Sequence, residues 1–282
     1  GAHKLNEIRP LQFLHIILGS TCTPTVLDRS TVLVEVTTVA VVVVSSESLV
    51  AEVEVASTLV EAVEAIASVV KVVTVVVAAV LVPTTGVEVV TVVEVINSST
   101  GKTWMDRNLG ASQVATSSTD ANSYGDVYQW GRKSDGHQCR TSATTSTLSS
   151  SDQPGHGDFI LPSSSLYDWR SPQNTNLWQG VNGVNNPCPS LYRLPTETEL
   201  DAERLSWSPN NSAGAFASPL KLTTAGMRAN SNGTLTSTGT NGYYWSSTVS
   251  STDSRGLFFG SGDAGMVAFN RAGGASVRCI KD

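Results

Sequence analysis

The residues best able to do chemistry are four carboxylates that lie close together in the chain, Glu197, Glu199, Asp201 and Glu203. Paired carboxylates can serve as general acid and general base. Thr196 precedes them, however, and a Thr followed three residues later by Glu has the spacing of a helix capping box. Acidic side chains in the first turn of a helix are also stabilised by the helix dipole. We therefore interpret this group as the start of a helix rather than as a catalytic pair.

No other catalytic or metal-binding pattern is complete. The sequence lacks the GxSxG, HExxH and Rossmann glycine patterns. TGKT at 100–103 resembles the end of a phosphate loop, but Ile96 stands where that loop needs its first glycine. His137 and Cys139 have the spacing of a ligand pair, and no second pair accompanies them. We predict that the protein is not an enzyme and that it holds neither a metal ion nor a cofactor.

Aromatic residues and charge divide the chain of 282 residues into two parts. All six Trp and all six Tyr lie after residue 100, and so do 20 of the 23 Gly. Residues 1–100 carry 4 Lys/Arg and 10 Asp/Glu, whereas residues 101–282 carry 14 of each. Neither part has the excess of positive charge that marks a nucleic-acid-binding surface. We therefore expect no nucleic-acid partner, and a domain boundary near residue 87.

Residues 1–30 form an N-terminal leader or tail. Lys4 and Arg9 precede the short apolar run LQFLHIILGSTC, as in a signal peptide, and Cys22 resembles a lipoprotein cysteine. Two polar residues interrupt the apolar run, so a strand or an ordered tail is the alternative. Both interpretations stay open at this point.

Residues 31–86 form a Val-rich region, and from Thr31 to Ile96 Val accounts for 28 of 66 residues. Val favours strands, and TVLVEV and AEVEV alternate with a period of two, so strands are expected over 31–56. Residues 57–82 also fit a heptad spacing, which leaves a helix or further strands open there. No uncharged stretch is long enough to cross a membrane. We expect a stalk, or a region through which the protein forms a homo-oligomer.

The aromatic-rich part opens with two predicted elements. In TVVEVINSSTGKTWM, alternating Val residues run up to Ile96, the turn sequence NSSTG follows, and an apolar pair comes after it. This pattern predicts a β-hairpin. ANSYGDVYQWGR (121–132) places three of its large side chains on one helical face and predicts a helix that ends at Gly131. In the capping-box helix, Leu200 and Leu205 are expected to face the core. The predicted core residues are Trp104, Tyr128, Trp130, Leu194, Leu200 and Trp245.

The last 41 residues, from Gly242 onward, predict an antiparallel meander. Four strand-like pieces (YYWSST, GLFFG, MVAFN and ASVRCI) are separated by the turn sequences SSTD, SGDAG and RAGG. Such turns have short side chains, which fill a core poorly but line a surface well.

Five separated motifs carry a resemblance to a known family: WMDRNLG, YGDVYQWGR, CPSLYRLPTETEL, YYWSST and SVRCIKD. In this order they closely resemble the Fibrobacter succinogenes major paralogous domain. The resemblance implies an α+β fold for residues 87–282, of the C-type-lectin-like kind shared with formylglycine-generating enzymes. It stops at about residue 87 and does not cover the Val-rich region, which is expected to be β-rich. The calcium-dependent sugar motifs of animal lectins are absent, so calcium-dependent sugar binding is not expected.

The same fold is used by variable proteins of diversity-generating retroelements, whose C-terminal strands and loops carry diversified ligand-binding residues. The stretch 250–275, between YWSST and SVRCIKD, resembles such a variable region. The resemblance therefore implies a ligand-binding protein displayed on a cell or virion surface or released outside the cell. Its partner would be a protein on a target cell or host. Two alternatives stay open, a structural surface or fibre subunit without a specific ligand and an enzyme of the formylglycine-generating type, which would need a reactive cysteine pair.

The family pattern around GLFF implies that Leu257 and Phe259 point inward, and strand alternation then turns Phe258 and Gly260 outward. By the same alternation, inward Met266 and Ala268 would leave Val267 and Phe269 outward. The expected ligand-binding residues are Asp253, Gly256, Phe258, Gly260, Asp263, Gly265, Val267, Phe269 and Asn270. This set has an apolar centre and a polar rim, as protein-binding patches have. A shift of one residue would invert the facing, and burial of both Phe258 and Phe259 is the alternative.

Two cysteines in the family motifs, Cys188 and Cys279, are expected to form a disulfide that ties the entry of the capping-box helix to the last strand. Cys139 is an equally available partner, so a different pairing stays open.

Overall fold

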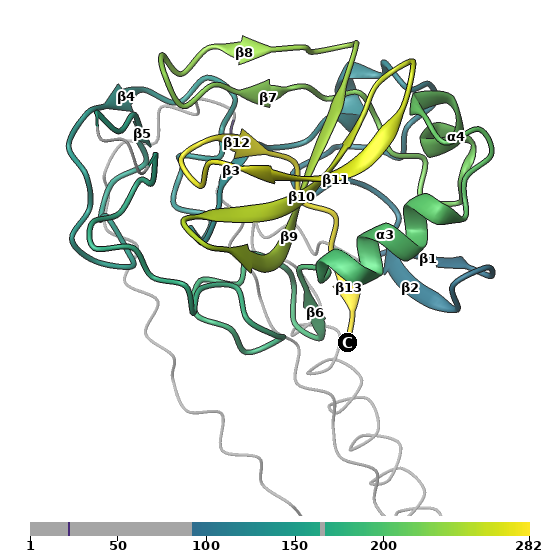
Figure 1. The fold of residues 1–282 in the computed structure, drawn as a ribbon, viewed down its shortest axis with the longest axis horizontal. Helices are drawn as coiled ribbons and strands as arrows, with labels where there is room; N and C mark the ends of the chain where they lie inside the picture. The colour runs from purple at the N-terminus through teal and green to yellow at the C-terminus, as the bar shows by residue number, and fades with distance from the viewer. Residues whose placement is uncertain (1–21, 23–91, 164–166) are drawn as a thin grey trace, which may run out of the picture. The chain divides into compact units, whose positions relative to one another are not determined.

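The computed structural model describes Cys22, residues 92–163 and residues 167–282, which form four small sheets and three short helices (Figure 1). The predictions of strands over 31–56 and of a helix or strands over 57–82 lie outside the described residues. The chain divides into two units, Thr25–Val89 and the rest. Within the described residues, no helix is long and apolar enough to cross a membrane. The fold class is thus mixed, with mostly antiparallel strands, as the α+β prediction required in its coarse form.

Strands from both ends of the aromatic-rich part meet in the first sheet. Its strands, in the order β1-β2-β13-β6, are β1 (Glu94–Asn97), β2 (Lys102–Met105), β13 (Ile280–Lys281) and β6 (Tyr192–Arg193). The predicted hairpin is confirmed, since β1 and β2 pair antiparallel around a turn that contains Gly101 at a φ of 66°. A positive φ of this size costs glycine little.

The second sheet is a three-stranded antiparallel meander in the order β11-β10-β9. Its strands are β9 (Gly242–Ser250), β10 (Asp253–Phe259) and β11 (Ala264–Phe269). Three of the four predicted strand pieces are confirmed by it. The fourth, ASVRCI, does not continue the meander, because it divides between β12 (Gly274–Ala275) and β13, which pair in the third and first sheets.

The remaining elements are short. The third sheet has the order β3-β12-β7-β8, with β3 (Tyr128–Gln129), β7 (Met227–Arg228) and β8 (Leu235–Thr236). The fourth is the parallel pair β4 (Thr144–Thr145) and β5 (Phe159–Ile160). The helices are the 3-10 helix η1 (Ala121–Ser123), α3 (Glu197–Leu205) and α4 (Ser212–Ala217).

The predicted helix over 121–132 is wrong beyond its first turn. Only η1 is helical there, because Gly125 takes a φ of 68° and turns the chain into an extended path toward β3. Pairing of β3 with β12 then uses the backbone groups that a helix would have needed. Gly131, at a φ of 86°, does have the left-handed conformation that its type predicted.

The capping box of α3 is confirmed. The Glu199 backbone N–H donates to the Thr196 hydroxyl over 3.3 Å, and the Thr196 backbone N–H donates to the Glu199 carboxylate over 2.8 Å. Leu200 is buried as predicted, but Leu205 is 68% exposed. Five residues turn a helix by about 500°, which points Leu205 well away from the face of Leu200. Glu203 occupies the buried position instead.

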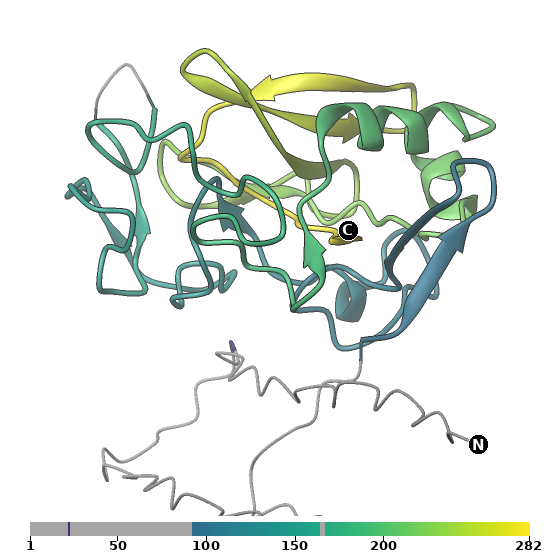
Figure 2. The ribbon, with the colours of Figure 1, turned by 90° about the horizontal axis from the view of Figure 1, so that it is seen from below.

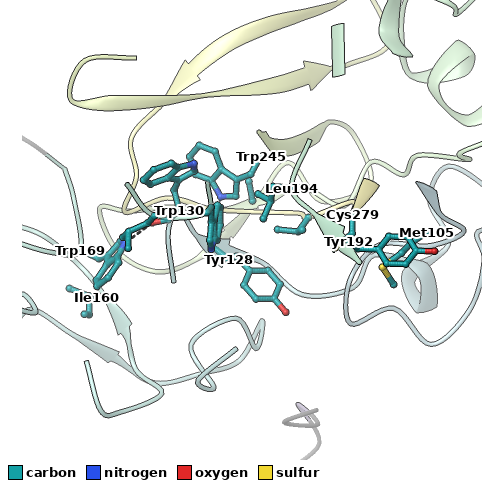
Figure 3. Close-up of a cluster of buried hydrophobic side chains, with 13 residues drawn as sticks. Met105, Tyr128, Trp130, Ile160, Trp169, Tyr192, Leu194, Trp245 and Cys279 are labelled. Atoms are coloured by element: carbon teal, nitrogen blue, oxygen red, sulfur yellow. Dashed lines mark hydrogen bonds between the residues drawn. The ribbon is translucent and has the colours of Figure 1, made fainter. Parts of the chain in front are cut away.

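The meander separates two hydrophobic clusters because adjacent residues of β9 face opposite ways. Tyr244 packs in one cluster with Leu257, Phe259 and Leu200, and α3 contacts all three strands on that side (Figure 2). Trp245 packs in the other cluster, and Figure 3 shows it there with Trp130, Tyr128 and Leu194. All six predicted core residues are buried.

Trp245 should be among the costliest core residues to truncate. Its ring is fully enclosed, and its indole N–H donates to the Tyr128 carbonyl over 2.7 Å. Trp245→Ala is expected to lower the free energy of unfolding by about 3–5 kcal/mol, measured by urea denaturation. The control Leu205→Ala, at the exposed end of α3, should cost less than about 1 kcal/mol. Equal losses in the two variants would contradict the assignment.

Candidate ligand-binding face

One side of the meander carries the outward residues that the sequence predicted. Phe258 of β10 stands opposite Tyr243 of β9 and Gly265 of β11. Val267 and Phe269 follow Gly265 on the same side, at alternate positions of β11. We call these five residues the meander face. Leu257 and Phe259 are fully buried on the opposite side, whereas Phe258 is half-buried, so the predicted facing of these three residues is confirmed. The outward position predicted for Gly260 is wrong, because Gly260 is buried.

Three aromatic rings hold one another in place on the meander face. The Tyr243 ring centroid lies 5.4 Å from that of Phe258 and 5.6 Å from that of Phe269. Phe269 also meets the buried Trp245 edge to face at 5.4 Å. Aromatic pairs at such separations stabilise one another beyond the area they bury. The face is therefore anchored in the core through Phe269, while Phe258 and Val267 stay partly open to solvent.

The predicted ligand-binding glycines have different roles in the meander. A Cβ on Gly256 would lie 2.5 Å from the Phe269 ring and 2.7 Å from the Tyr244 carbonyl, so the ring of Phe269 covers this glycine. A Cβ on Gly265 would meet nothing within 4 Å. Gly260 is buried beside Asn241. Of these three glycines, only Gly265 thus lies on open surface.

Polar residues surround the meander face at its ends. Asp263 is exposed in the turn between β10 and β11, and Asp253 and Asn270 are half-buried at the far end. Within the part of the chain that the structure describes, neither aspartate forms a salt bridge. The rim predicted from the turn sequences is therefore present, and its two carboxylates are available for contacts with a partner.

Ala268 lies on the inward side of the sheet but outside the core. Its register opposite Arg255 places it on the α3 side, as alternation requires, but its side chain is exposed rather than buried. β11 is the edge strand, and Arg255 spans this end of the sheet to reach Glu197 at the start of α3, over 2.7 Å. Met266, two residue pairs further along, does pack against the buried cluster.

A residue that sequence reasoning missed, Arg271, holds the rim in place. Its side chain is buried, and its Nη2 donates to the carbonyls of Ser251 and Asp253 over 3.2 Å each. The guanidinium lies 4.6 Å from the Trp130 ring centroid and 3.7 Å from the Asp168 carboxylate. Burial lowers the pKa of Arg271, and Asp168 opposes that shift. The sequence signal for it was a single arginine at the border of the predicted variable stretch.

The four carboxylates between residues 197 and 203 all have structural partners. Glu197 binds Arg255, Glu199 binds Arg193, and Asp201 binds Arg204. Glu203 is buried, and it accepts from Asn97 over 2.6 Å and from the Trp207 indole over 3.1 Å. Each carboxylate thus has a packing or pairing role that accounts for its position.

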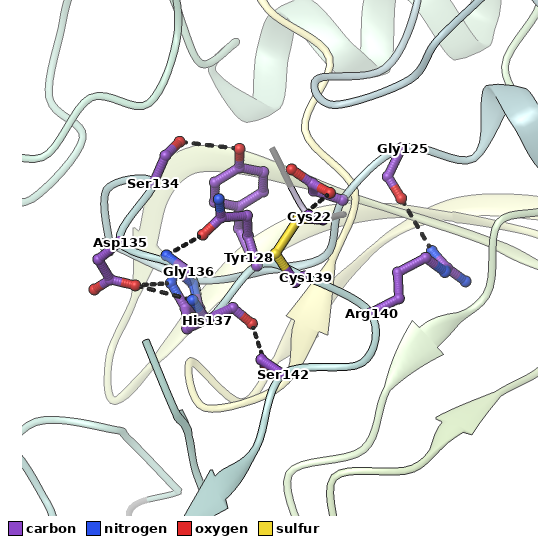
Figure 4. Close-up of a disulfide and its surroundings, with 12 residues drawn as sticks. Cys22, Gly125, Tyr128, Ser134, Asp135, Gly136, His137, Cys139, Arg140 and Ser142 are labelled. Carbon is purple, nitrogen blue, oxygen red and sulfur yellow. Dashed lines mark hydrogen bonds and ion pairs between the residues drawn. A yellow bond between two sulfur atoms is a disulfide. The ribbon is translucent and has the colours of Figure 1, made fainter. Parts of the chain in front are cut away.

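The two residues with the spacing of a metal-ligand pair, His137 and Cys139, both have structural partners. His137 is buried, with Nδ1 2.6 Å from the Asp135 carboxylate and Nε2 accepting from the Gln129 backbone N–H over 3.1 Å. Burial lowers the pKa of His137 to about 4, so the imidazole is neutral at pH 7. Cys139 forms a disulfide with Cys22 (Figure 4). Among the described residues, no group of three metal-ligating side chains lies together.

All four cysteines are paired. Cys188 and Cys279 form the predicted bridge from the α3 entry segment to the last strand segment. Cys22, which resembled a lipoprotein cysteine, is instead bonded to Cys139. Disulfides persist in oxidising compartments outside the cytosol, so the two bridges indicate a secreted protein.

The two strand glycines make a matched test of the meander face. Gly256→Ala is expected to displace the Phe269 ring and to lower the free energy of unfolding by about 1–3 kcal/mol, because overpacking strains a filled site. Gly265→Ala should change it by less than about 0.5 kcal/mol, since its surroundings are open. Urea denaturation with near-UV circular dichroism measures both. A Gly265→Ala loss as large as that of Gly256→Ala would show that the face is closed rather than open.

Comparison of the chain with protein-family models, with curated proteins and with solved structures gives no match. The resemblance to the Fibrobacter succinogenes major paralogous domain therefore stays a prediction from the five sequence motifs.

Proposed function

We propose that the protein is a surface-displayed binding protein whose meander face contacts a protein ligand. The observation that carries this proposal is that neighbouring residues of one meander strand alternate between buried and partly open positions. Leu257 and Phe259 are locked in the core, while Phe258 and Val267 are partly open on a face bordered by carboxylates. An aromatic and apolar centre with a polar rim is the usual composition of a protein-binding patch.

We further propose that the domain has the C-type-lectin-like fold and that the chain is a variable protein of a diversity-generating retroelement. This proposal is supported by the positions of the family motifs, which contribute to the core, and of the turns, which contribute open surface. Each of the five family motifs contributes buried residues, among them Trp104, Trp130, Leu194, Trp245 and Cys279. The stretch 250–275 supplies β10, β11 and their turns, and its open positions alternate with buried ones such as Leu257 and Phe259. Substitutions at the open positions could therefore change the face while the buried positions keep the scaffold.

The two alternatives make different demands. A formylglycine-generating-type enzyme would need a reactive thiol pair, whereas the two cysteines in the family motifs, Cys188 and Cys279, form a disulfide in which Cys279 is fully buried. A fibre subunit without a ligand would have no use for an open aromatic face with carboxylates on its rim. A role for residues 31–86 in homo-oligomerisation stays a prediction.

Paired display libraries test the proposal before any ligand is identified. The outward library randomises Phe258, Asp263, Val267 and Asn270. The inward control randomises Tyr244, Leu257, Phe259 and Met266. We expect most outward members to stay folded, scored by protease resistance on the display surface, and to yield binders to unrelated proteins. Most inward members should be cleaved, because cavities and overpacking in the core each cost several kcal/mol.

Two results would contradict the proposal. If the outward library lost folding as often as the inward one, the meander face would be part of the scaffold. If it folded but gave no binders to any target, the fibre-subunit alternative would gain support. The retroelement assignment has its own test in the gene, where codons 250–275 should differ from a nearby template repeat only at adenine positions.

A further inference from the structure

The disulfide between Cys22 and Cys139 (Figure 4) lies against a half-buried carboxyl group, Asp126. Asp126 Oδ1 is 3.2 Å from Cys22 Sγ. A disulfide sulfur has no hydrogen to donate, so a hydrogen bond across this distance requires the proton to be on the carboxyl. Burial raises the pKa of Asp126 to about 7, and the charge of Arg140 limits that rise. Tyr128 is the other titratable group close to Asp126, and burial raises its pKa far above neutrality.

We propose that Cys22–Cys139 is a reducible cross-link in which Asp126 protonates the departing sulfur, whereas Cys188–Cys279 is a permanent one. The reductant is an external thiol. Its thiolate attacks Cys139 Sγ and forms a mixed disulfide with it, and the Cys22–Cys139 bond breaks. The bonding electron pair passes to Cys22 Sγ, which takes the proton from the Asp126 carboxyl. A second external thiolate then attacks the reductant sulfur of the mixed disulfide and displaces Cys139 as a thiolate, which takes a proton from water. The two reductant molecules leave as a disulfide, and the Asp126 carboxylate regains its proton from solvent.

Access and a nearby proton donor favour attack at this bridge. Cys22 and Cys139 are both half-buried, so a small thiol can reach them. Arg140 follows Cys139 directly in the chain, and its charge acts on the Asp126 carboxyl. Thiol–disulfide exchange is faster when the leaving sulfur is stabilised and when the attacked sulfur is accessible. Asp126 beside Cys22 and the half-buried position of Cys139 meet these two conditions.

The second disulfide differs at its leaving sulfur. Cys188 is half-buried, like Cys22 and Cys139, so attack there would expel Cys279, which is fully buried in the cluster that contains Trp130 and Trp245. A thiolate formed there would lie in an apolar environment that disfavours its charge. No carboxyl contacts either sulfur within the described part of the chain. The two bridges of one molecule therefore form a natural comparison.

Timed alkylation of the full chain tests the proposal. The protein is incubated with dithiothreitol at pH 6.5, quenched with iodoacetamide, and its four cysteines are quantified by peptide mass spectrometry. We expect Cys22 and Cys139 to become alkylated at least about tenfold faster than Cys188 and Cys279. Equal rates for the two bridges would overturn the proposal.

The role of Asp126 has a separate readout. Asp126→Asn keeps the shape of the side chain but removes its acidic proton, and it should slow opening of Cys22–Cys139 by about tenfold or more. Asp263→Asn, an exposed carboxylate on the rim of the meander face, is the matched control and should leave the rate unchanged. The rate of Cys188–Cys279 reduction reports on folding, since an unfolded variant would expose both bridges alike.

The pH profile of the unmodified protein tests the same role without any variant. Expressed per dithiothreitol thiolate, the rate of opening should fall as pH rises through about 7, where Asp126 loses its proton. A flat profile from pH 6 to 8.5 would exclude Asp126 as the proton donor.

Discussion

The opposite facing of two neighbouring residues, Tyr244 and Trp245, governs the arrangement of the domain. Strand geometry allows nothing else, since successive side chains leave a strand on opposite sides. Tyr244 binds the meander to the α3 side, where its ring stacks on that of Phe259 at 5.7 Å. Trp245 binds it to the opposite cluster. A sheet held on both sides in this way has little freedom to shift, and its register fixes which side chains of β10 and β11 reach the surface.

Much of this arrangement could be predicted from the sequence wherever one local rule decides. The family pattern around GLFF implied that Leu257 and Phe259 point inward, and strand alternation then placed Phe258 outward. The spacing of Thr196 and Glu199 predicted the start of α3. The rule failed where long-range pairing competes with a local pattern. Residues 121–132 have helical spacing, but β3 is drawn into pairing with β12, more than 140 residues later in the chain. Likewise Ala268 has the correct orientation but nothing to bury it, because no strand follows β11 at the sheet edge.

Arginines were the least predictable structural residues. Arg278 is buried, and it donates to the Asn108 side chain and to the Leu220 carbonyl over 2.7 Å. Arg132 likewise reaches the carbonyls of His156 and Asp158, and Arg271 those of the β9–β10 turn. In a domain with short strands and long loops, many carbonyls lack a backbone partner, and a buried carbonyl without a donor is costly. A guanidinium with five N–H groups can satisfy several at once. Nothing in a single sequence distinguishes such an arginine from a surface one.

The bond between Cys22 and Cys139 gives the Val-rich region a covalent connection to the domain on its N-terminal side as well as on its C-terminal side. Residue 22 is joined to the domain through sulfur, and the chain enters the domain again through the backbone before β1. The disulfide and the backbone from Cys22 to Cys139 therefore form a covalent ring, and residues 23–91 are part of this ring rather than a tail with a free end. In topological terms the region behaves as an insertion. A single backbone break within it would release no fragment while the disulfide is intact, so whatever the region binds would stay joined to the domain.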